Sequence, residues 1–349
     1  MAKSTDKEKI EQKSSLGKTS EKTATLVVAR KNVLRESEEI AGESVKGYDF
    51  DKGLDYEKLI DSYATTGFQA TNLSKAIEII KKMSKEKAFI YLGYTSNLVT
   101  SGLRDIFCYL AENKMIDVIV TTAGGVEEDI IKCLGDFKIG KFNASGRDLR
   151  DRGINRTGNI FVPNSRYCRF EDFIQPVLQK ICEEQKKTGK IINPSELIWK
   201  LGEKINNNES IYYWCWKNKI KVYCPAITDG ALGDQIYFFK SKNPDFKIDV
   251  SDDIVEINNS TIGKKKTGVI ILGSGLMKHH ICNANMFRNG ADYAVYVNTQ
   301  EEYDGSDTGA RPDEAVSWGK IGKKAESVKV WADATIVFPI IVARCFVEK

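Results

Sequence analysis

Short apolar runs recur along the chain from Ala88 onward, and most are followed by a glycine-rich or polar turn and then a segment with helical periodicity. These runs cover residues 88–92, 117–120, 159–162, 221–224, 268–272, 293–297 and 328–332. They are nearly continuous in Val and Ile, which is typical of strands buried on both faces. The pattern predicts an α/β fold with a doubly wound, mostly parallel, Rossmann-like sheet and helices on both faces.

The first part of the chain has a different composition. Residues 1–24 carry almost no large apolar side chains and cannot offset the entropy of their own ordering. We therefore predict a flexible polar segment over residues 1–30 and a single α/β domain over residues 31–349. Within that domain, residues 55–63 and 73–83 place apolar side chains three or four positions apart, which predicts two helices.

Composition excludes several classes of protein. The net charge is only +4, with 52 basic and 48 acidic residues, which argues against a nucleic-acid-binding protein. Eight scattered cysteines with no C-x-x-C pair indicate free thiols, and two histidines are too few for a zinc cluster, so no metal is expected. No secretory signal or membrane-length apolar run is visible, which predicts a soluble, cytoplasmic protein.

The residues that follow the apolar runs are the candidates for chemistry, because ligands of open α/β sheets bind beyond the carboxyl ends of the strands. Hydroxyls, carboxylates, small residues and both histidines, His279 and His280, lie in these stretches, which include residues 298–320. The sequence therefore predicts one site at this edge of the sheet.

Two of the turns are suited to phosphate. Residues 122–125 (TAGG) and 273–275 (GSG) each follow a predicted strand and precede a helix-like segment, where glycine lets backbone N–H groups approach an anion. Neither is a G-x-G-x-x-G fingerprint, so ordinary turn glycines are the alternative.

Carboxylates form a second signal. Six of them are predicted to lie in strand-end loops, where an anionic pocket suits a polycation such as a polyamine. They are Glu127, Glu128, Asp229, Asp234, Asp307 and Glu314. The alternative for each is an acid at a helix N-terminus, where the helix dipole favours it.

A lysine and a histidine complete the candidates. Lys320 ends the motif SWGK close to Trp318, and an amine partly desolvated beside a ring can lose its proton and form an imine. His279 is the natural proton acceptor. Taken alone, each has a simpler interpretation: an exposed lysine and a structural histidine.

Five stretches together resemble the deoxyhypusine synthase family: GYTSNLVTSG, TTAGGVEEDIIKCL, PAITDGALGD, KHHICNANMFRNGADYAVYVNT and EYDGSDTGARPDEAVSWGKI. The resemblance extends from about Gly47 to Lys349. It implies a homotetramer of tight dimers with NAD and spermidine bound where two subunits meet. It also implies that the N-terminal segment can cover a neighbouring subunit's site.

The resemblance assigns roles to residues. Lys320 would hold the aminobutyl imine and His279 would transfer protons. The anionic pocket is predicted to include Glu127, and the other implied polyamine contacts are Glu128, Asp234, Gly305, Ser306, Asp307, Glu314 and Trp318. The implied NAD contacts are Ser96, Asn97, Leu98, Val99, Thr100, Thr122, Ala123, Gly124, Glu128, Asp229, Ser274, Thr299, Gln300, Asp333 and Ala334.

The implied reaction is an NAD-dependent transfer of the 4-aminobutyl group of spermidine, through the lysine imine, to a lysine of the eukaryotic initiation factor 5A precursor. Two departures from the family pattern are Ser274, where a third glycine is more usual, and Thr100 in place of serine. Ser274 could narrow the approach to the cofactor. The alternatives are homospermidine synthase, with putrescine as acceptor, a catalytically silent paralogue and a plain nicotinamide dehydrogenase.

Overall fold

The structure is a computed structural model that describes residues 22–347, so the first 21 residues of the predicted polar segment lie outside it. The chain divides into two compact units with the boundary between Ser44 and Val45. In the first unit residues 22–33 are helical, and residues 22–44 are all exposed. The second unit holds both sheets and all of the candidate site residues.

The main sheet has six strands in the order β6-β2-β1-β7-β8-β9, and every neighbouring pair is parallel. The strands are β1 Phe89–Tyr94, β2 Val118–Val120, β6 Lys221–Tyr223, β7 Thr267–Leu272, β8 Ala291–Asn298 and β9 Ile321–Trp331. The predicted Rossmann-like α/β fold is confirmed. The chain moves outward from β1 to β2 and β6, then returns to β7, so the strand order reverses between β1 and β7. Such a reversal opens a crevice for ligands.

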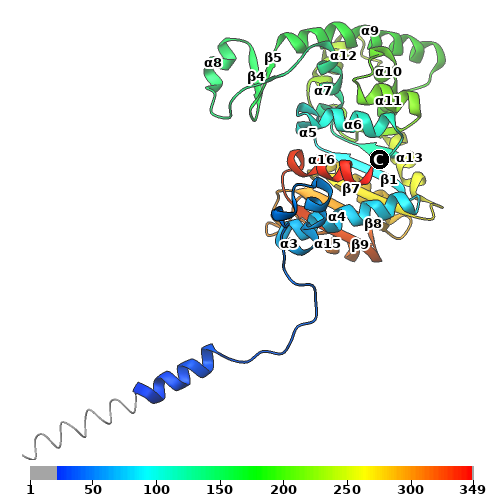
Figure 1. Ribbon diagram of the computed structural model, residues 1–349. Coiled ribbons are helices and arrows are strands. Elements are labelled where there is room, and N and C mark those ends of the chain that lie inside the picture. The colour runs from blue at the N-terminus through cyan, green and yellow to red at the C-terminus, as the bar shows by residue number, and fades with distance from the viewer. Residues whose placement is uncertain (1–21, 348–349) are drawn as a thin grey trace, which may run out of the picture. The chain divides into compact units, whose positions relative to one another are not determined.

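One predicted strand belongs elsewhere. The run at 159–162 corresponds to β5 (Ile160–Pro163), which pairs antiparallel with β3 (Lys138–Ile139) and β4 (Ile154–Thr157) in a separate sheet. A four-residue apolar run does not show whether its partners are parallel or antiparallel. With α8 (Gly146–Asp151), these strands form an arm that projects from the rest of the unit (Figure 1).

Successive side chains of the central strands point to opposite faces. Leu92 and Tyr94 of β1 enter one buried cluster, whereas Tyr91 enters another. The first face is covered by α4 (Phe68–Lys85), α6 (Leu103–Glu112) and α16 (Ala334–Cys345). The second is covered by α13 (Ser251–Thr261), α14 (Leu276–Met286) and α15 (Pro312–Ser317).

The two predicted helices near the start of the domain are both present, with different bounds. Residues 55–63 form α2 (Tyr56–Asp61), which the Asp55 side chain caps, and the start of α3 (Tyr63–Thr66). Residues 73–83 lie inside α4. The remaining elements are η1 Phe50–Lys52, α5 Ser96–Thr100, α7 Ala123–Leu134, α9 Ser165–Thr188, α10 Pro194–Ile205, α11 Ile211–Asn218 and α12 Ala231–Lys242.

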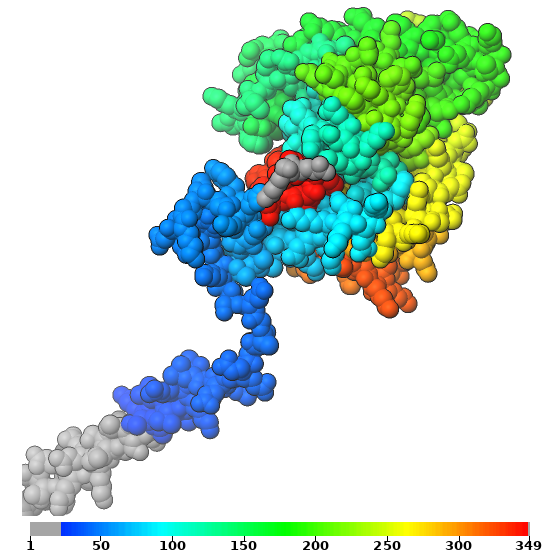
Figure 2. Space-filling view, turned by 45° about the vertical axis from the view of Figure 1, so that its right-hand side comes forward, coloured from blue at the N-terminus to red at the C-terminus, as the bar shows by residue number. Residues whose placement is uncertain are grey.

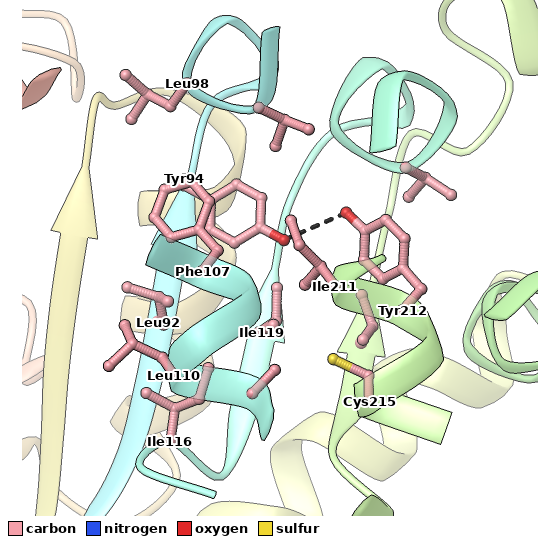
Figure 3. Close-up of a cluster of buried hydrophobic side chains, with 14 of the residues drawn as sticks. Leu92, Tyr94, Leu98, Phe107, Leu110, Ile116, Ile119, Ile211, Tyr212 and Cys215 are labelled. Carbon is pink, nitrogen blue, oxygen red and sulfur yellow. Dashed lines mark hydrogen bonds between the residues drawn. The ribbon is translucent and has the colours of Figure 1, made fainter. Parts of the chain in front are cut away.

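Helices α9, α10 and α11 form a layer of their own. In Figure 2 its green surface lies above the cyan surface of α5 and α6. The Tyr212 hydroxyl of α11 meets the Tyr94 hydroxyl of β1 at 3.2 Å and donates to the Gly125 carbonyl oxygen of α7 at 2.8 Å. Tyr94 also stacks on Phe107 of α6 with 4.2 Å between the ring centroids (Figure 3). These buried contacts fix α7 and α11 against the sheet.

A buried ion pair reinforces the same junction. The Arg104 Nε atom of α6 lies 2.8 Å from Asp129 Oδ1 of α7, and both side chains are almost fully buried. Asp129 also accepts hydrogen bonds from the Ser210 hydroxyl and the Ile211 amide at the start of α11. One carboxylate therefore joins three helices.

All eight cysteines are free thiols; five are buried, and Cys168 is exposed. Among residues 22–347, no helix combines the length and apolarity that crossing a bilayer requires.

Candidate functional site

A pocket of about 310 Å³ opens at the carboxyl ends of β1, β7, β8 and β9, next to the reversal of strand order. Seven of the predicted cofactor residues line it: Asn97, Leu98, Ser274, Thr299, Gln300, Asp333 and Ala334. These residues come from four separate stretches of the chain. The expectation that ligands bind beyond the carboxyl ends of the strands therefore identified residues that line a pocket.

Two helix N-termini meet at this pocket. Helix α14 follows the turn of Gly273 and Gly275, whose φ angles of +79° and +80° favour glycine. Helix α16 begins at Ala334, where the Asp333 side chain accepts from the Thr335 amide. The positive ends of the two helix dipoles make this edge of the sheet attractive to phosphate.

Ser274 lies between the two glycines without backbone strain, because its φ is not in the left-handed region. Its hydroxyl donates to the Thr308 carbonyl oxygen at 2.6 Å. The serine therefore ties this turn to the loop at residues 299–311.

Residues 122–125 are not among the residues that line the pocket, and they do not form the predicted turn. Helix α7 already begins at Ala123, so both glycines lie in its first turn. A Cβ atom on Gly124 would come within 2.8 Å of Ser96 Cβ, which shows that the glycine allows α5 to pack closely. The Thr122 hydroxyl oxygen is buried and has no hydrogen-bond partner among the described residues. This hydroxyl is therefore available to a polar ligand.

Most of the candidate carboxylates are not in loops as predicted. Glu127 and Glu128 lie in α7, Asp234 in α12 and Glu314 in α15, while Asp229 and Asp307 do lie in loops. The prediction failed because a glycine-rich stretch after a strand can enter a helix at once. Asp234 and Glu314 lie in the first turns of their helices, the alternative placement that the sequence allowed, whereas Glu127 and Glu128 lie beyond the first turn of α7.

The two adjacent glutamates of α7 have different surroundings. Glu127 Oε2 accepts from the Leu232 amide at 2.6 Å, so it caps the first turn of α12. Glu128 contacts the Thr100 hydroxyl, and burial raises its pKa to about 7. Asp229 and Asp234 are exposed at the start of α12. Glu128 is thus a buried acid poised to titrate near neutral pH.

Asp307 lies in the loop at residues 299–311, beside α14. Its Oδ2 atom is buried, has no hydrogen-bond partner among the described residues and lies 4.0 Å from Lys278 Nζ. Gly305 adopts a φ of +74° in the same loop, and Ser306 is exposed. The orphaned oxygen suits a hydrogen-bonding cation such as an ammonium group.

Lys320 is buried, and its Nζ atom lies 5.7 Å from the centroid of the Trp318 ring. Its backbone is held on both sides: its amide donates to the Ala315 carbonyl oxygen and its carbonyl oxygen accepts from the Ala291 amide. Because Ala291 and Ile321 are the first residues of β8 and β9, Lys320 lies at the amino ends of these strands. The prediction that it belongs to the carboxyl edge was wrong.

Lys320 lies a whole strand length away from the carboxyl ends where it was predicted. From Ala291 to Asn298 strand β8 rises about 23 Å at 3.3 Å per residue. After β8, the loop at 299–311 and α15 carry the chain back across the sheet, and α15 packs against β8 and β9. Glu314 and Trp318 return with it, and both are exposed. Nothing in the sequence indicates this reversal, since a helix of six residues is too short to show a period.

The two histidines differ. His279 is exposed in the first turn of α14, and its Nδ1 lies 3.2 Å from the Asn283 amide nitrogen. The His280 ring is mostly buried, and burial lowers its pKa to about 4. His279 is therefore the histidine that a substrate can reach.

The candidates fall into two groups. The cofactor edge comprises the pocket together with Thr100, Thr122, Glu128, Asp229 and Asp234. The lysine face comprises Glu314 of α15, Trp318 and Lys320 between α15 and β9, and the further candidates His279 of α14 and Asp307 of the loop at residues 299–311. Within residues 22–347, no hydrogen bond, ion pair or ring contact joins a side chain of the cofactor edge to Lys320 or His279.

The structure also identifies residues that sequence reasoning missed. Thr95, Asn298 and Thr308 line the pocket, and each lies inside a stretch that was singled out without being named as a site residue itself. Lys278 is only 2% exposed, yet nothing in the sequence distinguishes it from a surface lysine.

Comparison with known proteins shows what the chain as a whole is similar to. The family model "Deoxyhypusine synthase" matches residues 58–345. Deoxyhypusine synthase of Senecio vernalis is 51% identical over 92% of this chain and 94% of its own, and homospermidine synthase 2 of the same plant is 50% identical over the same shares. A crystal structure of an Entamoeba histolytica protein designated deoxyhypusine synthase superposes with a TM-score of 0.66 at 39% identity, covering 86% of this chain and 96% of its own.

Proposed function

The chain belongs to the deoxyhypusine synthase family, and from this membership we propose that it moves the 4-aminobutyl group of spermidine to a lysine of the eukaryotic initiation factor 5A precursor, with NAD as cofactor. The observation that carries the proposal is the presence, in one chain, of a pocket suited to a dinucleotide and a buried lysine amine beside an indole ring. A dehydrogenase needs only the first, whereas group transfer through an imine also needs the second.

The cofactor edge would hold NAD. The N-termini of α14 and α16 favour its phosphates, and the unpartnered Thr122 hydroxyl offers a further contact. When bound, NAD supplies a reversible hydride acceptor at this edge.

The lysine face would carry the covalent chemistry. The Lys320 amine would attack the imine carbon of spermidine that has lost hydride to the cofactor, and as the C–N bond to diaminopropane breaks, the four-carbon fragment would stay on Lys320 as an imine. His279, exposed in the first turn of α14, would take and return the protons of these steps. Asp307 and Glu314 pair with the ammonium groups of the polyamine. The indole of Trp318 shields the imine from water.

The separation of the two groups supports a site shared between subunits. A lysine side chain cannot bridge the length of β8 to reach its own cofactor pocket. In a symmetric dimer, the lysine face of one copy would meet the cofactor edge of the other, so that Glu128 and Asp234 face the polyamine held on the partner's lysine face. Two such dimers would form the homotetramer that the family resemblance implies. The N-terminal segment over residues 1–30 remains the candidate cover for a neighbouring site, and its described part, residues 22–30, is exposed.

The proposed function and its main alternative, homospermidine synthase, differ in the molecule that accepts the aminobutyl group. Homospermidine synthase 2 is as similar to this chain as the deoxyhypusine synthase of the same plant, so overall identity does not separate a protein lysine from putrescine as acceptor. The test is a transfer assay with labelled spermidine and NAD, in which the initiation factor precursor and putrescine are offered separately. We expect label on the protein and none when NAD is omitted. Label on putrescine alone would replace the proposal with homospermidine synthase, and no transfer to either would contradict both.

A further inference from the structure

The loop at residues 299–311 serves both halves of the proposed reaction. Thr299 and Gln300 at its start line the cofactor pocket, and Gly305, Ser306 and Asp307 form its polyamine-binding turn. It contains no helix or strand, so its shape depends on contacts with its neighbours.

Two lysine amines supply these contacts. Lys278, in the first turn of α14, donates to the carbonyl oxygens of Asp307 and Ala310, the latter at 2.9 Å. Lys329, on β9, donates to the carbonyl oxygens of Gln300 and Gly309, at 2.7 and 2.5 Å. Each amine thus joins two points of the loop, and the two lysines come from different elements.

Lys278 is an unusual residue to bury. Its side chain is 2% exposed, and its amine lies 4.0 Å from the Asp307 carboxylate and 4.9 Å from the centroid of the Tyr296 ring. A buried ammonium group is costly unless it is well paired, so this amine fits only where the loop supplies its acceptors. Burial lowers the pKa of Lys278, and the nearby Asp307 opposes that shift.

We propose that Lys278 and Lys329 are positioning residues that clamp the loop at 299–311, Lys278 setting the polyamine-binding turn and Lys329 joining that turn to the cofactor-binding start. This inference rests on the proposed function for what the loop binds, whereas the clamp itself rests on the contacts alone. The different roles follow from the carbonyl oxygens that each amine contacts. Lys278 binds only within residues 307–310, whereas Lys329 bridges Gln300 to Gly309.

The test uses the full chain and four variants. Lys278→Met and Lys329→Met keep the length of the side chain but remove the donors, Lys278→Arg keeps the charge, and Lys324→Met removes an exposed lysine from the same strand as Lys329. Steady-state rates give kcat and the KM values for spermidine and NAD. Hydrogen exchange of the loop peptides, measured without ligands, reports its rigidity independently of activity.

We expect Lys278→Met to raise the KM for spermidine at least about tenfold, as the loss of one to two charge-assisted hydrogen bonds implies, with the KM for NAD within about twofold. Lys329→Met should raise both KM values. Loop amides should exchange about tenfold faster in both variants, Lys278→Arg should recover part of the spermidine KM, and Lys324→Met should behave as wild type.

Wild-type exchange of the loop in Lys278→Met and Lys329→Met would overturn the clamp, as would a fall in kcat with both KM values unchanged. If Lys278→Met does not fold, the half-buried Lys329 still decides the question. If the wild-type protein transfers no label, the proposed function fails, but the exchange measurement still tests the clamp.

Discussion

The Lys320 carbonyl oxygen accepts a hydrogen bond from the Ala291 amide, 3.1 Å away, at the first residue of β8. That bond fixes the proposed nucleophile at the amino ends of the strands, while the cofactor pocket opens at their carboxyl ends. The nucleophile and the cofactor pocket of the proposed reaction therefore lie at opposite edges of the same sheet.

Active sites shared between subunits can be rebuilt from two inactive variants. Lys320→Ala should damage the lysine face and Glu128→Gln the cofactor edge, so each alone should lose most activity. After the two are mixed, unfolded and refolded together, a random two-fold assembly should regain about a quarter of wild-type activity, because half of the dimers hold one intact site of two. Activity no higher than the sum of the separate variants would argue for sites built within one chain.

Lys320→Ala should abolish transfer while leaving ligand binding largely intact, because its amine is needed for the covalent step and the dinucleotide pocket lies elsewhere. Equilibrium titration with NAD, followed by spermidine, measures both affinities directly. Lys323→Ala, an exposed lysine three residues further on, is the control. Full transfer by Lys320→Ala would rule out the imine.

Asp307→Asn should weaken spermidine binding much more than NAD binding, since only the polyamine is a cation at this position. Loss of one charge-assisted contact predicts a rise in the spermidine dissociation constant of about tenfold or more. Asp304→Asn, in the same loop but exposed, serves as the control. Equal losses for both ligands would contradict the anionic slot.

The raised pKa of Glu128 gives a pH dependence. Its carboxyl is protonated below about pH 7 and ionised above it, because burial disfavours the charge. Only the ionised form attracts an ammonium group, so kcat/KM for spermidine should fall with decreasing pH through about 7, with a slope approaching one per pH unit. Glu128→Gln should have a lower plateau without that fall. A wild-type profile that is flat from pH 6 to 8 would contradict this role.

Arg104→Met should destabilise the fold, because it leaves the Asp129 carboxylate buried without its cation. The expected loss in the free energy of unfolding is about 3–5 kcal/mol. Lys82→Met removes one partner of the exposed pair with Glu326 and should cost far less, because solvent screens that pair. Urea unfolding of the two variants compares them, and similar losses would mean that the buried pair has no special weight.

The sequence predicted the sheet well because its strands are buried on both faces, and continuous Val and Ile runs such as residues 268–272 leave little alternative. It also predicted residues that line the pocket, since the expectation that ligands bind beyond the carboxyl ends of the strands depends only on the direction in which each strand runs. It misplaced β5, whose four residues carry no information about their partners.

The position of Lys320 could not be predicted for a related reason. The residues from Thr299 to Lys320 follow a strand, but where they end depends on how α15 packs against β8 and β9. That packing is tertiary, and a six-residue helix leaves no periodic trace in the sequence. The burial of Lys278 was hidden in the same way, because its acceptors are backbone carbonyl oxygens rather than side chains.

The path of residues 299–320 from one edge of the sheet to the other has a genetic consequence. In the proposed shared assembly, the start of this stretch would serve the cofactor site of its own subunit, and Lys320 would serve the site of a neighbour. A subunit from a mutant allele that lacks Lys320 would therefore disable a site whose NAD is bound by a normal subunit. In a heterozygous cell, some of the disabled active sites would therefore be ones whose NAD is bound by the product of the normal allele.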